Sequence, residues 1–443
     1  MACEQVTLQD VCELIVDCPH TSAKDEGVGY PLIRTPNVGR GRLILTDVHR
    51  VSQDVYERRV SRAVPRQGDL ILAREAPAGN VAIVSPGIEV CLGQRTMLLR
   101  PDSSFVVPEY LNYYLNAPEQ RDRMLRLANG ATVSHINVAD IRNMPVQLPS
   151  RGEQSKVAEL LNVLDDKIDL NNRLNDYLAD FASTVFQNQA SHIEERIALF
   201  DIADIKYGKG LAKNELVEDG YPVFGGNGQI GFYSKYLYEE PQILISCRGA
   251  ASGKVLVSLP KSFITSNSLI IELKDRRYYE YLKQYFMLHQ LYDYATGSAQ
   301  PQITIDGLRH LTVPYPPFDL IKTLTNQLKA ISDCIYSNDI ENQALSRLRD
   351  TLLPKLMSGE IDVSKVDLTQ LTNNHLSGCG SFCSVCCPSG LASEFHEWFR
   401  EHFSLVTVTY AKQIWDGRIC PKDTKEEESC RLVVTVIEVG SKN

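Results

Sequence analysis

The stretch GATVSHINVADIRNMPVQLP, from Gly130 to Pro149, returns later in the chain as GSAQPQITIDGLRHLTVPYP, from Gly297 to Pro316. The two copies align without a gap at a shift of 167 residues, so that Ile136 matches Ile303. This period is far longer than the roughly 20 to 50 residues of a solenoid repeat, and it therefore indicates a duplicated domain. Two similar halves predict a ligand with two parts.

Helical periodicity follows each copy of the repeat. Core positions recur at alternating spacings of four and three residues, the heptad pattern by which helices pair. The first series is Val157, Leu161, Leu164, Ile168, Asn171, Asn175, Leu178, Ala182 and Val185, and the second is Leu324, Leu328, Ile331, Ile335, Asn338, Asn342, Leu345, Arg349 and Leu352. We expect two long helices, residues 151–190 and 318–362, that pack on each other.

Asparagine interrupts both series at equivalent places. An asparagine at a core position costs stability but fixes register, because only one alignment lets the amides pair. We therefore predict that Asn171 and Asn175 face Asn338 and Asn342. Each helix follows its own globular half, so an antiparallel coiled coil would place the halves at opposite ends of a rod. At about 1.5 Å per residue this rod would be on the order of 50 Å long.

Each half repeats one order of expected elements, which makes the fold class α+β. A Gly-Tyr-Pro turn at 29–31 or 220–222 precedes short β-rich runs, such as 69–73 and 242–246. A helical stretch, 109–126 or 278–294, leads to the repeated segment and its long helix. The globular domains are expected at residues 1–150 and 199–317.

Composition is that of a soluble globular protein with two or three domains: of 443 residues, 43% are hydrophobic and 23% charged. No apolar run approaches the roughly 18 residues of a membrane helix, and the N-terminus lacks a signal peptide's basic start and apolar core. We expect a cytoplasmic protein without membrane contact. Single cysteines in apolar contexts predict buried, reduced thiols; these are Cys3, Cys12, Cys18, Cys91, Cys247 and Cys334.

Three duplicated or adjoining motifs carry a family resemblance: GSAQPQITIDGL at 297–308, DKIDLNNRLNDYL at 166–178 and LRDTLLPKLMSGEI at 348–361. Over about residues 5–365 the chain resembles the specificity (S) subunit of type I restriction-modification systems. The resemblance implies two target-recognition domains, each reading half of a split double-stranded DNA target. It also implies that the helices set the unread spacer and bind methyltransferase (M) subunits, expected to be two, which restriction and translocase (R) subunits then join.

Catalytic motifs are missing from the sequence. We find neither the Asn/Asp-Pro-Pro-aromatic motif of an adenine methyltransferase nor the Gly-x4-Gly-Lys-Ser/Thr loop of a translocase. The run GAASGKV at 249–255 is expected to be a turn between strands. GNGQIG at 226–231 is also expected to be a turn, because a strand-like run, 232–238, follows it where a dinucleotide site needs a helix. We assign this chain no catalytic residue and no cofactor; S-adenosylmethionine, ATP and Mg are expected on the partners.

Base-reading residues are harder to assign. Arginine can bind guanine through two hydrogen bonds, and asparagine or glutamine can do the same with adenine. Candidates in turns or beside strands are Arg34, Thr35, Asn37, Arg40, Arg42, Arg74 and Arg95 in the first half, and Lys206, Lys209, Lys213, Asn227, Gln229, Arg248, Lys254 and Asn267 in the second. For each, the alternative is a solvated charge or turn residue, and phosphate contacts should outnumber base contacts. For 300–302 and its counterpart 133–135, a shared structural role is favoured.

The tail, residues 367–443, departs from the family pattern. It contains Cys379, Cys383, Cys386 and Cys387, spaced as in an iron-sulfur or zinc site, but too few residues follow for the barrel of a radical enzyme. We assign no metal there and no role to the tail. Its cysteines leave a metal-cluster enzyme as one alternative function.

A coiled-coil scaffold that binds protein rather than DNA is the second alternative, and the net charge of −9 favours it slightly. A duplicated domain on a rigid spacer matches a split linear target more naturally. DNA binding that weakens steeply with salt would separate the two, because neutralising phosphates releases counterions.

Overall fold

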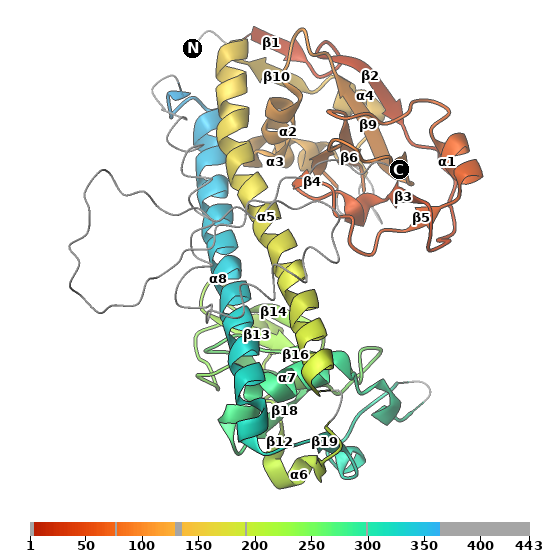
Figure 1. Cartoon of the computed structure of the whole chain (residues 1–443). Helices are drawn as coiled ribbons and strands as arrows, with labels where there is room; N and C mark the ends of the chain where they lie inside the picture. The colour runs from red at the N-terminus through yellow and green to blue at the C-terminus, as the bar shows by residue number, and fades with distance from the viewer. Residues whose placement is uncertain (1–3, 76–77, 129–134, 191–192, 298–299, 364–443) are drawn as a thin grey trace, which may run out of the picture. The chain divides into compact units, whose positions relative to one another are not determined.

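The computed structural model of the chain describes residues 4–75, 78–128, 135–190, 193–297 and 300–363 (Figure 1). These residues form two compact units. Unit 1 runs to Asn171 and resumes at Ile340, and unit 2 spans Asn172–Asp339.

Unit 1 contains three sheets and four short α-helices. The main sheet has the order β2-β9-β6-β7-β4, formed by Cys12–Asp17, Thr96–Pro101, Leu70–Ala73, Val81–Ile83 and Gly41–Arg42. The second sheet, β5-β3-β8, is formed by Arg50–Val51, Tyr30–Ile33 and Cys91–Leu92, and the third pairs β1 (Glu4–Thr7) with β10 (Pro145–Leu148). The α-helices are α1 (Gln53–Arg59), α2 (Pro108–Asn116), α3 (Pro118–Leu127) and α4 (Val138–Arg142), and one 3-10 turn is η1 (Thr35–Asn37).

Unit 2 has the same kinds of sheet. Its main sheet, β12-β18-β15-β16, is formed by Ala203–Tyr207, Ser268–Leu273, Ile243–Ser246 and Val255–Val257. The second, β14-β13-β17, is formed by Gly228–Tyr233, Tyr221–Gly225 and Phe263–Ile264, and β11 (Arg196–Ala198) pairs with β19 (Thr312–Pro314). The α-helices are α6 (Leu199–Ile202) and α7 (Tyr279–Leu288), and the 3-10 turns are η2 (Lys213–Glu215), η3 (Arg276–Tyr278), η4 (Tyr292–Tyr294) and η5 (Asp306–Leu308).

The duplication extends to strand topology. The order β2-β9-β6-β7 corresponds strand by strand to β12-β18-β15-β16, and every pairing in both series is antiparallel. The parallel pair of β3 with β8 corresponds to the parallel pair of β13 with β17. The strand that opens each unit pairs antiparallel with the strand that precedes a long helix. The two duplicated α+β domains predicted from the sequence are therefore confirmed.

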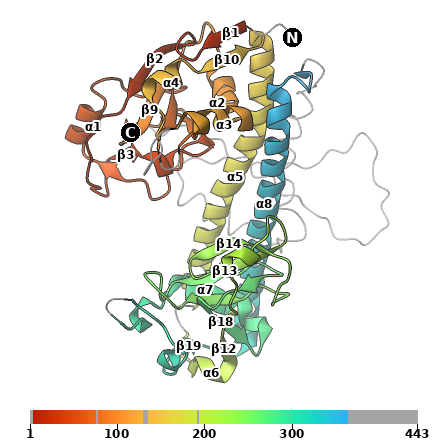
Figure 2. The ribbon, with the colours of Figure 1, turned by 180° about the vertical axis from the view of Figure 1, so that it is seen from behind.

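Two helices of 40 residues each, α5 (Arg151–Ala190) and α8 (Phe318–Met357), follow the repeated segments. They lie side by side in both views (Figures 1 and 2). Their contacts run in opposite order along the chain. In unit 1, Asp165 meets Arg349 and Asn171 meets Asn342. In unit 2, Asn175 meets Asn338 and Gln189 meets Gln327.

The apolar faces of both helices complete the domain cores. In unit 1, Val157 and Leu161 of α5 and Leu353 and Leu356 of α8 share one buried cluster with the main sheet. In unit 2, the corresponding cluster includes Leu178, Phe181, Leu324 and Leu328. Of the predicted heptad positions, Val157, Leu161, Leu178, Leu324 and Leu328 are buried, whereas Ile168, Ile335, Leu345 and Leu352 are half-buried. The buried positions contact the globular part of their own unit as well as the opposite helix.

The helical stretch predicted at 109–126 is two helices, which corrects the expectation of one. Ala117 has φ −60° and ψ 143°, an extended conformation that ends α2 and begins α3. The cause is Pro118, because a proline disfavours the helical conformation in the residue before it. In unit 2, the stretch predicted at 278–294 is helical in α7 only to Leu288, and η4 follows.

Other expectations can be compared directly. Of the turn predicted at 226–231, only residues 226–227 lie between β13 and β14, because Gly228–Gly231 already belong to β14. Residues 249–253 lie between β15 and β16 and form a turn as predicted. The strand expected at 232–238 is shifted, because β14 already begins at Gly228 and ends at Tyr233. Within the described ranges no helix is long and apolar enough to cross a membrane. Cys18, Cys91, Cys247 and Cys334 are buried, Cys12 is half-buried, and none of these five forms a disulfide, whereas Cys3 lies outside those ranges.

Candidate nucleic-acid interface

In unit 1, the loop after β3 uses its polar side chains on its own backbone. Asn37 Oδ1 accepts a hydrogen bond from the Arg34 amide at 3.2 Å, and Asn37 Nδ2 donates to the Ile44 carbonyl at 3.1 Å. Thr35 and Asn37 are buried, and Arg34 is half-buried. Asn37 therefore holds the loop together, and its burial keeps its amide from a base edge in this conformation.

The two arginines of the GRGR loop have different surroundings. Arg42 Nη2 donates to Asp166 Oδ1 of α5 at 2.5 Å, and Arg42 Nη1 lies 3.8 Å from Asp169 Oδ2. Arg40 is exposed. Burial and then the charge of Arg40 lower the pKa of the Arg121 guanidinium. Arg42 is thus bound to α5, whereas the charge of Arg40 acts on a second arginine, Arg121.

Arg74 and Arg95 flank strands β6 and β9, and both form ion pairs. Arg74 Nη1 donates to Asp17 Oδ1 at 2.6 Å, and its Nε donates to the Ile136 carbonyl at 3.0 Å. Arg95 Nε lies 2.9 Å from Glu75 Oε2, and the Arg95 side chain is 53% exposed. Arg95 also has φ 66°, a left-handed conformation that is uncommon outside glycine. Of the two, Arg95 is accessible and Arg74 ties the repeated segment to the sheet.

In unit 2, the structure brings Asn227 and Lys254 together. Lys254 Nζ donates to Asn227 Oδ1 at 3.0 Å. Asn227 and Gln229 are exposed at the β13–β14 turn, and Lys254 lies just before β16. This turn therefore presents two amides and an ammonium group.

Arg248 and Asn267 lie on adjoining loops and are both exposed. The Cys247 backbone amide donates to the Asn267 backbone carbonyl at 3.0 Å. The backbone of Arg248 forms an isolated β-bridge with Gln302 of the repeated segment. The remaining candidates are more scattered. Lys209 and Lys213 are exposed, and Lys206 pairs with Glu272 across β12 and β18.

The charge of Lys206 is paired with the carboxylate of Glu272. Burial opposes ionisation of the Glu272 carboxyl, but hydrogen bonds from Lys206 and Tyr238 outweigh it and lower its pKa. The charge of Lys206 is therefore balanced by a carboxylate within the sheet. Lys206 is a weaker candidate for phosphate binding than Lys209.

The repeated segment has the same backbone role in both units. In unit 1, the Ile136 amide donates to the Arg74 carbonyl at 3.1 Å, and the Arg74 amide donates to the Arg95 carbonyl. In unit 2, the Ile303 amide donates to the Cys247 carbonyl at 3.1 Å, and Cys247 donates to Asn267. His135 forms an isolated antiparallel β-bridge with Glu75, and Gln302 forms the corresponding β-bridge with Arg248. The segment therefore closes onto the loop after the central strand of each domain, which agrees with a structural role for 300–302 and for His135, whereas residues 133–134 lie outside the described ranges.

The four helix asparagines meet in pairs. Asn171 Nδ2 donates to Asn342 Oδ1 at 2.9 Å and to Glu341 Oε2 at 2.8 Å. Asn338 Nδ2 donates to Asn175 Oδ1 at 2.7 Å, and Asn175 Nδ2 donates to Asp339 Oδ1 at 2.9 Å. The two facing pairs are those predicted, and two carboxylates of α8 join them.

One buried network was not anticipated. Asp165 is 4% exposed; its Oδ1 accepts from Arg349 Nη1 at 2.7 Å and its Oδ2 from Tyr113 Oη at 2.7 Å. Burial, followed by the charge of Asp165, raises the pKa of Tyr113. The network joins α2, α5 and α8 within unit 1. A signal was present in the sequence, because Arg349 occupies a core position of the heptad series and a charge there needs a partner.

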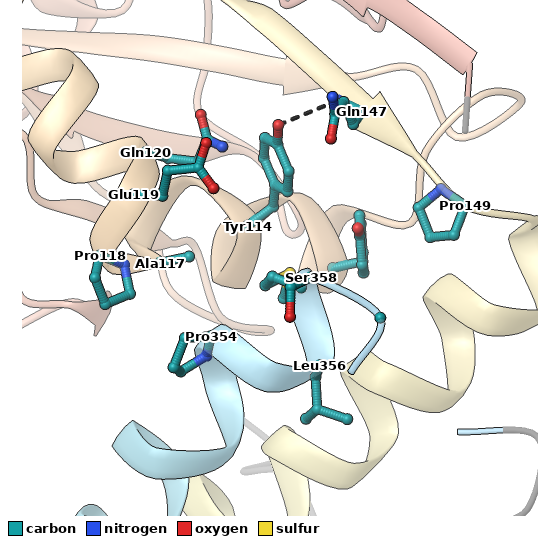
Figure 3. A pocket seen from close by; sticks show the side chains of 13 residues that line it. Tyr114, Ala117, Pro118, Glu119, Gln120, Gln147, Pro149, Pro354, Leu356 and Ser358 are labelled. Atoms are coloured by element: carbon teal, nitrogen blue, oxygen red, sulfur yellow. Dashed lines mark hydrogen bonds between the residues drawn. The ribbon is translucent and has the colours of Figure 1, made fainter. Parts of the chain in front are cut away.

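A cavity of about 430 Å³ in unit 1 lies between α2, α3, β10 and the end of α8 (Figure 3). Its wall includes Tyr114, Glu119, Gln147 and Ser358, and the Gln147 amide donates to Tyr114 Oη at 3.1 Å. The lining contains one carboxylate and no histidine, cysteine or lysine. This wall lacks the nucleophile–base pair or ligand set that a catalytic centre needs.

No group of three or more His, Cys, Asp or Glu residues is arranged to hold a metal ion within the ranges that the structure describes. Cys379, Cys383, Cys386 and Cys387, with the rest of the tail from 367 to 443, lie outside those ranges.

Comparison with known proteins agrees with the duplicated architecture. A family model described as the type I restriction modification DNA specificity domain matches residues 2–179 and 195–348, more than half of the chain. The MjaIX specificity subunit of Methanocaldococcus jannaschii is 23% identical over 72% of this chain and 84% of its own length. The HindI specificity subunit of Haemophilus influenzae is 21% identical, over 67% and 87% respectively.

A solved S subunit of a type I system from M. genitalium is also similar. It covers 80% of this chain and 96% of its own length, with a TM-score of 0.48 and 19% identity. This chain thus has two matched domains, two corresponding sets of sheets and two long helices. The chain belongs to the family of type I restriction-modification DNA specificity proteins and carries two copies of the family's domain.

Proposed function

We propose that this chain is the DNA-reading specificity subunit of a type I restriction-modification complex, with each unit reading one half of a bipartite target. The duplicated strand topology carries the proposal, because two domains of one architecture suit two separate half-sites. Residues 1–150 and 199–317 are the proposed recognition domains. Residues 151–190 and 318–362 are the proposed spacer helices.

The long helices serve in this proposal as an antiparallel coiled coil that sets the spacer between half-sites. The opposite order of their contacts supports the orientation, and the facing pairs Asn171–Asn342 and Asn175–Asn338 support a fixed register. Inserting four residues near Asp180, about one helical turn, lengthens the preferred spacer and leaves both half-sites unchanged. A spacer of unaltered length would refute the proposal that the helix pair sets the distance between the half-sites.

Phosphate contacts are proposed for exposed or half-buried basic residues that form no ion pair with the described residues. In unit 1, the candidate is Arg40, whose side chain is exposed on the GRGR loop. In unit 2, Lys209, Arg248 and Lys254 are the corresponding candidates. Asn227, Gln229 and Asn267, which are exposed, are the amides proposed to contact base edges.

Catalysis is proposed to reside on partner subunits: two M subunits with S-adenosylmethionine, and R subunits with ATP and Mg, in the cytoplasm. Exposed apolar residues on α8, Ile340 and Leu348, support a role of this helix in partner binding. They lie two turns apart on one face, where a partner helix would bury them.

The deciding experiment is methylome sequencing of cells with and without this chain, in the presence of its methyltransferase. A new methyladenine motif with two half-sites around an unread spacer is expected. Exchanging residues 199–317 for the domain of a relative should change one half-site alone. If no motif appears and binding of the complex to DNA is insensitive to salt, the protein-scaffold alternative stands instead.

A further inference from the structure

The β13–β14 hairpin of unit 2 contains a β-bulge at Ile230. Val223 pairs with Gly231 and Phe224 pairs with Gln229, so Ile230 is the extra residue without a partner in the ladder. Strand β14 is also the edge of its sheet, which has the order β14-β13-β17. A bulge at an edge strand bends the strand and redirects a side chain, and bulges are enriched next to functional sites.

The redirected side chain is apolar and points into solvent. Ile230 is 52% exposed, and its neighbour Gln229 is exposed as well. Glycines make the arrangement possible. A Cβ on Gly225 would lie 3.0 Å from Ile230 Cγ2, and Gly228 has φ 125°, which other residues rarely adopt. The hairpin is therefore built to present Ile230 outward.

The polar groups beside Ile230 limit what it can contact. Asn227 is exposed, and its Oδ1 accepts a hydrogen bond from Lys254 Nζ, so its Nδ2 remains a donor for a ligand. The hairpin tip and the residue before β16 thus supply an amide, an ammonium group and an exposed branched apolar side chain. A thymine edge in the major groove combines an acceptor, O4, with the adjacent 5-methyl group.

We propose that the β13–β14 hairpin enters the major groove of the second half-site and that Ile230 contacts the 5-methyl group of a thymine there. The major groove is wide enough for a two-stranded β-ribbon. Asn227 Nδ2 donates to an acceptor on the same or the next base pair, and Lys254 fixes the amide that does so. The inference rests on the proposed DNA-reading function and assigns a specificity-determining residue within it.

The test uses the full chain assembled with its methyltransferase subunits and synthetic duplexes of the target found by methylome sequencing. Each thymine of the second half-site is replaced in turn by deoxyuridine, which removes only the 5-methyl group. At one position the affinity should fall about fourfold, the effect of one buried methyl-sized group. The Ile230→Ala complex should bind both duplexes equally, and Ile230→Leu should keep part of the difference.

Ile44→Ala is the matched control, because Ile44 is 49% exposed on a glycine-rich loop of the other unit. It should leave the thymine-to-uracil difference in the second half-site unchanged. A second half-site without an A·T pair, or one with no methyl-sensitive thymine while specific binding persists, would overturn the inference and leave the proposed function standing. Failure of the Ile230→Ala chain to assemble would place Ile230 against a protein partner and also overturn it. Absence of specific DNA binding by the unaltered complex would refute the proposed function itself.

Discussion

Asn171 Nδ2 of α5 donates a hydrogen bond of 2.9 Å to Asn342 Oδ1 of α8, and Asn171 is 2% exposed. Replacing Asn171 by alanine would leave the Asn342 amide without this partner in a buried seam. We expect the free energy of unfolding to fall by about 1–3 kcal/mol. The double variant Asn171→Leu with Asn342→Leu should recover the loss, because apolar pairs stabilise such seams while relaxing their register.

Thermal unfolding of the purified chain measures both effects. Asn188→Ala, at an exposed position on the same helix, is the control and should change little. A double leucine variant no more stable than Asn171→Ala would show that packing, and not the amide pair, limits stability at this place.

The Asp165–Arg349 pair should be more sensitive to mutation than the surface pairs. Arg349→Ala leaves the Asp165 carboxylate buried with Tyr113 as a donor, and losing one partner of a buried pair costs about 3 kcal/mol or more. Urea unfolding measures the loss. Asp350, whose side chain is 62% exposed, is the second carboxylate that pairs with Arg349. Asp350→Asn removes this charge and should lower the free energy of unfolding by less than about 1 kcal/mol. Equal losses from the two substitutions would contradict a dominant role for Asp165.

Asp339 predicts a pH dependence. Burial raises the pKa of the Asp339 carboxyl, although a hydrogen bond from Asn175 opposes this. A carboxyl whose folded-state pKa is raised destabilises the fold when ionised, and this penalty disappears as pH falls below its ordinary pKa. Asp339→Asn keeps the acceptor oxygen and should therefore raise the melting temperature at pH 7, with a smaller gain near pH 4. A gain independent of pH would exclude ionisation as the cause.

Arg40 and Arg42 form a matched pair for DNA binding. Arg40→Ala should weaken binding to all sequences and lower the salt slope of the binding constant by about 1, as expected for one phosphate contact. Arg42→Ala should chiefly lower stability, since its guanidinium is bound to Asp166. Salt titrations of DNA binding by the assembled complex would distinguish them. An unchanged slope for Arg40→Ala would remove Arg40 from the interface.

The duplication and the helix pair were predictable because each produces a residue pattern that can be recognised in the sequence alone. The copies at 130–149 and 297–316 needed only alignment, and the asparagines interrupt a heptad series that is readable without coordinates. The pairing of Asn171 with Asn342 followed from that series.

The candidate site was less predictable because several of its side chains form hydrogen bonds with residues that are distant in the sequence. Arg42 follows a glycine and looks free, but Asp166, 124 residues later, binds it. Arg74 is held by Asp17, 57 residues earlier. Ile230 was passed over because its exposure depends on a bulge that pairing with β13 creates, and no propensity marks a bulge in advance.

The core of unit 1 contains Leu353, Leu356 and Val363 together with residues from the first 161 positions of the chain. A stop codon late in the gene, after Asn342, would therefore strip packing from the domain encoded at the gene's beginning. The second domain draws instead on Ile321 and Leu324, which such a truncation retains. Nonsense mutations close to the 3′ end should thus abolish recognition of the half-site read by the domain translated first.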